Sequence, residues 1–92
     1  MPKILIFNAI WIFIIYPTDM YENRMHVHVG KKDSFDLCKI WLEPNIEIVK
    51  PGELTKKEQN EVLNIAKKYS NLLEQQWKDF IAGKNIKPIK AK

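Results

Sequence analysis

The hydrophobic pattern of this 92-residue chain changes its period once, at Pro51-Gly52. Before this break, apolar residues form short runs rich in Ile, Val, Phe and Trp, which is typical of β-strands. After it, apolar residues recur at three- and four-residue steps from about Lys56 to Ala82, without Pro or Gly, as in an amphipathic α-helix. Strands followed by one long helix predict an α+β fold, and the length leaves room for a single domain over residues 1–83.

Both ends of the helix carry sequence signals. Thr55 followed three residues later by Glu58 is a capping box, in which each side chain accepts a hydrogen bond from a backbone N–H at the helix start. Gly83 is placed to end the helix, because glycine adopts the left-handed conformation that often follows a last turn. Ser70-Asn71 is a place where the helix could kink.

The first half of the chain predicts a small antiparallel sheet of four to five strands packed on this one C-terminal helix. The expected strands are Ile4 to Phe7 and Ile10 to Tyr16, joined as a hairpin at Asn8-Ala9, then Met25 to Val29, Leu37 to Leu42, and a short edge strand from Ile46 to Val49. Ala9 is an unusual residue for the hairpin turn, since a positive φ costs alanine more than glycine.

The second hairpin strand is apolar on both faces. By the period of two, one face carries Ile10, Ile12 and Ile14, and the other carries Trp11, Phe13 and Ile15. One helix covers one face of a sheet, so the second apolar face predicts a homo-oligomer or a small protein partner. A sheet that curls around its helix would remove that need.

The positive charge is concentrated at the C-terminus. The chain has 15 Lys+Arg and 11 Asp+Glu, a net charge of +4, but four of the lysines (Lys84, Lys87, Lys90 and Lys92) lie beyond the last acid. Residues 84–92 are therefore expected to form a flexible, lysine-rich tail, and residues 1–81 have no net charge. Nucleic-acid binding by the body would need a local patch, for which Arg24, Lys31, Lys32 and Lys39 are the candidates.

The chain is expected to be cytoplasmic. The apolar run from Ile4 to Tyr16 is too short to span a bilayer, which needs about 20 apolar residues, and no small-residue cleavage site of a secretory signal follows it. Cys38 is the only cysteine, which excludes an intrachain disulfide and fits a reducing compartment. A buried, unreactive Cys38 is expected.

The candidate chemistry centres on His26 and His28. Two histidines at i and i+2 on a strand face the same side, about 7 Å apart, and Arg24 shares that side if the strand begins early enough. Paired imidazoles can act as general base and general acid in phosphodiester cleavage, and an arginine can hold the phosphate. A histidine triad hydrolase would need a third histidine at position 24 or 30, where this chain has Arg24 and Gly30.

Two other interpretations of the histidines remain open. They could be half-exposed residues that form hydrogen bonds or line an interface. They could also bind zinc, but the pair needs a third ligand, for which Asp19, Glu22, Asp36 and Cys38 are the candidates. No metal or other cofactor is predicted.

Lys39 and Trp41 share one face of the next strand. Together they could pair with or stack on a nucleotide, which makes them candidate substrate-binding residues with Arg24. The alternative is that Trp41 is an ordinary core residue, as is expected for Trp77 in the apolar stripe of the helix.

The chain resembles the bacterial family called domain of unknown function 4160. The resemblance rests on the segments MPKILIF, IWIFIIY, MHVHV, KIWLEP, and LTKKE through QQWKDF, which cover residues 1–81. Positions that recur in the family fall on His26, His28, Lys39, Trp41, Leu42 and Trp77. This chain departs from the family at Met25, where a proline is usual, at Ala9, where glycine is common, and in the lysine-rich tail.

The resemblance implies a genetic context rather than an activity. Members of the family are often encoded beside another small domain, in an arrangement like that of toxin-antitoxin operons. One hypothesis is therefore a toxin-like component of a two-protein module acting on RNA, with His26 and His28 as acid/base residues. The alternative is a non-catalytic interaction domain that uses the hairpin and the histidine strand as an oligomer interface.

Overall fold

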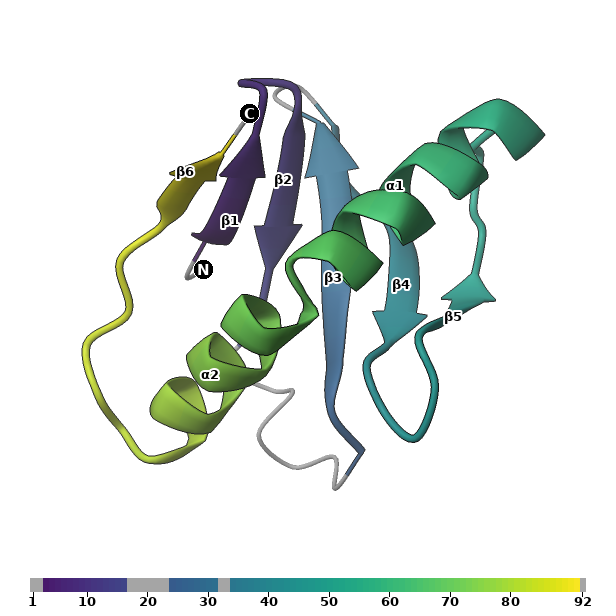
Figure 1. Cartoon of the computed structure of the whole chain (residues 1–92). Helices are drawn as coiled ribbons and strands as arrows, with labels where there is room; N and C mark the ends of the chain where they lie inside the picture. The colour runs from purple at the N-terminus through teal and green to yellow at the C-terminus, as the bar shows by residue number, and fades with distance from the viewer. Residues whose placement is uncertain (1–2, 17–23, 32–33, 92) are drawn as a thin grey trace.

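The structure, a computed structural model, describes residues 3–16, 24–31 and 34–91, and for residues 34–37 it describes the backbone only. The elements follow in the order β1 (Lys3–Phe7), β2 (Trp11–Ile14), β3 (His26–Lys31), β4 (Ser34–Trp41), β5 (Glu47–Lys50), α1 (Lys56–Lys68), α2 (Ser70–Ile81) and β6 (Ile89–Ala91). Both helices lie across one face of a single sheet (Figure 1). The α+β class predicted from the sequence is confirmed.

The sheet has six strands in the order β5-β4-β3-β2-β1-β6. Strands β1 to β5 pair antiparallel with their neighbours, as expected, but β6 pairs parallel with β1, which makes the sheet mixed. The expected sheet of four to five antiparallel strands is therefore corrected at this edge. Residues 84–92 are expected to be a flexible tail, but Ile89–Ala91 within them form a strand that extends the sheet.

Strand β6 forms because its backbone satisfies groups that β1 would otherwise leave at a sheet edge. The Asn8 N–H donates to the Ala91 carbonyl over 2.7 Å. The buried Gln76 amide of α2 donates both to the Ile4 carbonyl of β1 and to the Lys87 carbonyl that leads into β6. One helix residue thus joins the first strand to the last segment of the chain.

The hairpin turn is formed where the sequence predicts it. Asn8 and Ala9 have φ values of 53° and 56°, and the Ile10 N–H donates to the Phe7 carbonyl over 3.0 Å. Positive φ at both central residues is the geometry that matches the twist of a hairpin. Ala9 adopts it despite its Cβ atom, because the pairing of β1 with β2 fixes the turn.

The expected single helix is wrong: the chain forms two helices that meet at Tyr69. A straight helix over residues 56–82 would be about 40 Å long, longer than the 34 Å extent of the molecule. The break at Tyr69, next to the expected kink, instead lets α1 and α2 both lie against the sheet (Figure 1). Among the described residues, no helix is long and apolar enough to cross a membrane.

The predicted helix boundaries are confirmed. The Glu58 N–H donates to Thr55 Oγ1, and the Thr55 N–H donates to Glu58 Oε1, which completes the capping box. At the other end, Gly83 has a φ of 79°, and the Gly83 and Lys84 N–H groups donate to the carbonyls of Phe80 and Asp79. This pair of hydrogen bonds is a Schellman motif.

The hydrophobic core lies between the sheet and the helices. The sheet contributes every second residue of its central strands, and the helices contribute their apolar stripe. The sheet residues Trp11, Phe13, Ile15, Val27, Val29, Cys38 and Ile40 meet the helix residues Val62, Ile65, Ala66, Leu73 and Trp77. Cys38 is 2% exposed, as expected for a buried cysteine.

The second face of the hairpin is less open than the sequence suggested. Ile12 and Ile14 are 7% and 0% exposed, although neither belongs to the core beneath the helices. Ile10 is 47% exposed and is the one residue of that alternating set left at the surface. The described residues therefore do not leave a broad apolar face on β2 for a partner.

Candidate functional site

The structure brings all five predicted site residues together where β3 pairs with β4. Cross-strand pairing places His26 opposite Trp41 and His28 opposite Lys39. Arg24, just before β3, reaches the same group. The alternation expected from the sequence is therefore correct, because core residues such as Val29 point to the other face.

Trp41 is the centre of this group. The Arg24 guanidinium lies 4.1 Å from the centre of the indole ring, and the Lys39 ammonium lies 4.8 Å from it. The side chains of all three are partly exposed. Arg24 and Lys39 are distant in the sequence. Their common contact with one aromatic ring, and not a run of basic residues, forms this positively charged surface.

Glu43 holds Arg24 and the start of β3 in place. The Arg24 Nε–H donates to the Glu43 carbonyl over 2.7 Å, and the Met25 N–H donates to Glu43 Oε1 over 3.1 Å. The Leu42 N–H returns a bond to the Met25 carbonyl. Methionine at position 25, one of the departures from the resembled family, supplies an N–H that proline lacks.

His26 is completely buried. Its Nδ1 lies 2.8 Å from the Arg24 carbonyl, and because a carbonyl only accepts, Nδ1 donates in this contact. The imidazole centre lies 5.0 Å from that of Trp77, 5.6 Å from that of Trp41 and 5.5 Å from that of His28. His26 thus joins α2 to the aromatic group on the sheet and is not exposed to a macromolecular substrate.

His28 is in a different position, although it lies two residues away. It is partly exposed, and its nearest described ring neighbour is Tyr16, with ring centres 4.6 Å apart in an edge-to-face arrangement. Sequence reasoning missed Tyr16. The signal was present, because Tyr16 continues the alternation that places Ile12 and Ile14 on one face of the hairpin strand.

The candidate third ligands for a zinc ion at the two histidines do not support a metal site. Among the described residues, no group of three or more His, Cys, Asp and Glu side chains could hold a metal ion. Cys38 points into the core on the opposite face of the sheet from His28. Asp19 and Glu22 lie outside the described residues, as does the side chain of Asp36.

Of the expected basic patch, Lys31 lies apart from Arg24 and Lys39. Lys31 forms a salt bridge of 2.6 Å with Glu58 of α1 and lies over the Trp11 ring, away from Trp41. The hydrogen bond from Lys31, with a weaker one from the Thr55 backbone, holds the pKa of Glu58 below its usual value near 4.5. Lys32 lies outside the described residues, so Arg24 and Lys39 are the members of the patch that the structure brings together.

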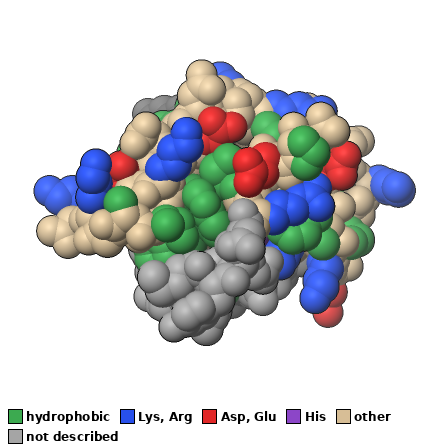
Figure 2. Space-filling model, turned by 90° about the horizontal axis from the view of Figure 1, so that it is seen from below, with side chains coloured by type: hydrophobic (Ala, Val, Ile, Leu, Met, Phe, Trp, Pro, Cys, Tyr) green, Lys and Arg blue, Asp and Glu red, His purple; other side chains and the backbone are tan. Residues whose placement is uncertain are grey.

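Basic and acidic side chains alternate over the surface seen in Figure 2, with hydrophobic side chains between them. They do not separate into a basic and an acidic half on that face. This agrees with the zero net charge of residues 1–81. Positive charge on the described surface is therefore local, and Arg24 and Lys39 over the Trp41 ring form one such cluster.

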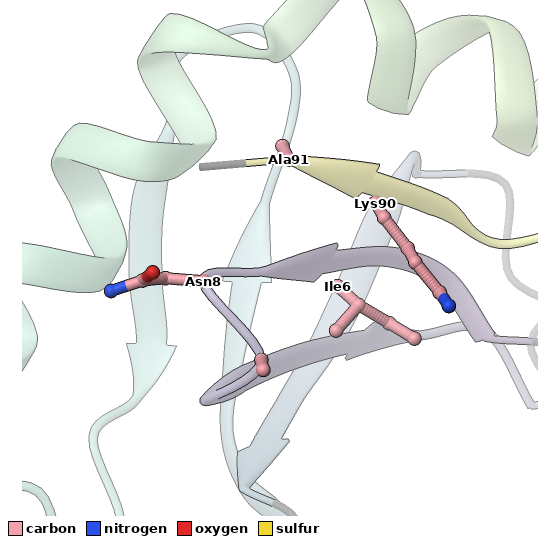
Figure 3. Close-up of a pocket in the computed structure, with 5 residues that line it drawn as sticks. Ile6, Asn8, Lys90 and Ala91 are labelled. Carbon is pink, nitrogen blue, oxygen red and sulfur yellow. The ribbon is translucent and has the colours of Figure 1, made fainter.

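A shallow hollow of about 300 Å³ lies at the other end of the sheet. It is lined by Ile6, Asn8, Ala9, Lys90 and Ala91, between the hairpin turn and β6 (Figure 3). Ile6 and the long side chain of Lys90 lie on the side of the sheet away from the helices (Figure 3). The hollow is mainly apolar and separate from the histidines.

Comparison with known proteins gives one result. The sequence profile of a family described as Domain of unknown function (DUF4160) matches residues 10–78. The matched region runs from the hairpin turn to α2 and includes all five predicted site residues, whereas β1 and β6 lie outside it. No curated protein and no solved structure matches the chain.

Proposed function

The chain belongs to the DUF4160 family, and we propose that it acts on single-stranded RNA in the cytoplasm, as the toxin-like component of a two-protein module. The observation that carries the proposal is the convergence of Arg24 and Lys39 on the Trp41 ring, beside the partly exposed His28. Two cations can bind successive phosphates of an RNA strand. An imidazole beside them is suited to proton transfer near neutral pH.

The two histidines have separate roles in this proposal. His28 is the acid/base residue, because it is the one that a bound phosphodiester can reach. His26 is buried and acts through its packing against Trp41 and Trp77, not by touching RNA. Arg24 and Lys39 bind phosphate, and Trp41 holds both of them in place.

Binding is tested by fluorescence anisotropy with a labelled single-stranded RNA at several salt concentrations. For the double variant Arg24→Ala/Lys39→Ala we expect weaker binding, with the slope of log affinity against log salt reduced by about 0.7 for each phosphate that the variant no longer neutralises. Lys56→Ala/Lys57→Ala is the matched control, because it removes two exposed cations at the start of α1. An equal decrease of affinity in both double variants would show that the binding is not local.

The toxin-like role is tested by expression in a bacterial host. We expect growth arrest with the wild-type chain and none with His28→Ala. Circular dichroism of the purified variant checks that the fold is intact. Persistent arrest with a folded His28→Ala variant would contradict the acid/base role, and the absence of arrest with the wild-type chain would contradict the toxin-like role.

A second candidate function, a non-catalytic interaction domain, is favoured by the hairpin end of the sheet. Ile10 is 47% exposed there and directly follows Asn8 and Ala9, which line the hollow. In this case the hairpin is the interface with a second copy or with a small protein partner. Ile10→Asp should then convert a dimer to a monomer in analytical ultracentrifugation, while leaving RNA binding unchanged; a wild-type monomer would contradict the homo-oligomer.

A further inference from the structure

We propose that Tyr16 is a catalytic residue that works with His28 in RNA cleavage, as the general acid that protonates the leaving oxygen. The inference rests on the proposed function and adds a residue to it. Tyr16 lies two residues after the end of β2 and His28 lies in the middle of β3, and their ring centres are 4.6 Å apart. Both side chains are partly exposed.

The need for a second proton-transfer group follows from the burial of His26. Cleavage of a phosphodiester by a neighbouring hydroxyl requires one group to remove a proton and another to supply one. His26 is fully buried behind Trp41 and Trp77, so it cannot serve the second role by direct contact. The pair of histidines suggested by the sequence therefore has only one member at the surface.

The two cations of the site have other roles in this proposal. An arginine guanidinium does not donate a proton to a leaving group, so Arg24 is left to bind phosphate. Lys39 lies opposite His28, but its ammonium is over the Trp41 ring, where it is placed to neutralise phosphate. Among the described neighbours, the Tyr16 phenol is the remaining group with an exchangeable proton close to the His28 ring.

The step is a transesterification in which every proton has a donor and an acceptor. His28 removes the proton of a ribose 2′-hydroxyl, and the 2′-oxygen forms a bond to the adjacent phosphorus. The bond between phosphorus and the 5′-oxygen of the next nucleotide breaks, and Tyr16 gives its phenolic proton to that oxygen. The products are a 2′,3′-cyclic phosphate and a 5′-hydroxyl, and the proton on His28 returns to Tyr16 through solvent.

The test uses an RNA in which sulfur replaces the leaving 5′-oxygen at the cleavage site, mapped first on unmodified RNA. A thiolate leaves without protonation, so a missing general acid matters only for the oxygen substrate. We expect Tyr16→Phe to lower the cleavage rate of the oxygen substrate by about 10²- to 10⁴-fold and to cleave the sulfur substrate at close to the wild-type rate. His28→Ala should lose activity on both substrates.

Tyr69→Phe is the matched control, because Tyr69 lies between the helices and contacts Phe7, away from the histidines. It should cleave both substrates as the wild-type chain does. A Tyr16→Phe variant that is fully active on the oxygen substrate would overturn the assignment, as would one impaired equally on both, which marks a structural role. If the wild-type chain cleaves neither RNA, the proposed function itself fails, and the role of Tyr16 falls with it.

Discussion

The two faces of β3 differ in chemistry although they alternate along the same six residues. Toward the helices, Val27 and Val29 pack in an aliphatic core, and Lys31 ends the row in an ion pair with Glu58. On the other face, His26 and His28 join an aromatic group that carries two cations. The difference shows that one face stabilises the fold by burial, whereas the other places His28, Lys39 and Trp41 where a ligand can reach them and keeps His26 buried.

The largest effect is expected on the core face. Phe13 of β2 lies beside Val29 and is completely buried. We expect Phe13→Ala to lower the free energy of unfolding by about 3 to 5 kcal/mol, since it leaves a cavity in addition to removing buried apolar surface. Urea denaturation measures the decrease. Ile10→Ala, at an exposed position of the same hairpin, should change it by less than about 0.5 kcal/mol.

On the face of β3 that carries the histidines, the clearest test compares the stability of variants at His26 and His28. His26→Ala should cost about 2 to 3 kcal/mol of stability, because it removes a buried ring and its hydrogen bond to the Arg24 carbonyl. His28→Ala removes a partly exposed ring and should cost less than about 1 kcal/mol. The two variants are compared by thermal and urea denaturation. Equal destabilisation would contradict the distinction between a buried histidine and an accessible one.

Local sequence signals predicted those parts of the fold that depend on neighbouring residues. The Asn8-Ala9 turn, the Thr55 capping box and the stop at Gly83 are each set by hydrogen bonds within a few residues. The shared face of His26 and His28 follows from the period of a strand. These features were therefore predictable without knowledge of the tertiary structure.

Features that depend on distant contacts were not predictable in this way. Strand β6 has only three residues, among lysines, and is recognised by its pairing with β1 and by Gln76. The break at Tyr69 lets both helices lie against one sheet, which is a tertiary arrangement (Figure 1). The burial of His26 depends on Trp77, which is 51 residues further along the chain.

The two faces differ in whether a cation on them affects the pH dependence of stability. On the core face, Lys31 holds the pKa of Glu58 below its usual value near 4.5. A carboxylate with a depressed pKa in the folded state stabilises the protein fully above its unfolded pKa, and this contribution is lost as the pH falls through the folded value. Urea denaturation between pH 7 and pH 3 should therefore show an acid loss of stability that is smaller in Lys31→Ala. Lys39→Ala, which alters the other face, should retain the full acid loss.

The smallest effect on stability is expected at Glu43, whose hydrogen bonds to Arg24 and Met25 hold the start of β3 in place. Its carboxylate accepts from the Met25 N–H, whereas its backbone carbonyl accepts from Arg24. Glu43→Gln keeps an acceptor for Met25 and should be close to neutral, but Glu43→Ala should cost about 0.5 to 1 kcal/mol. Arg24 keeps its backbone partner in both variants, so RNA affinity should change little. A large decrease of affinity in Glu43→Ala alone would mean that the Met25 bond, which a proline at this position could not form, also sets the position of the cations on Trp41.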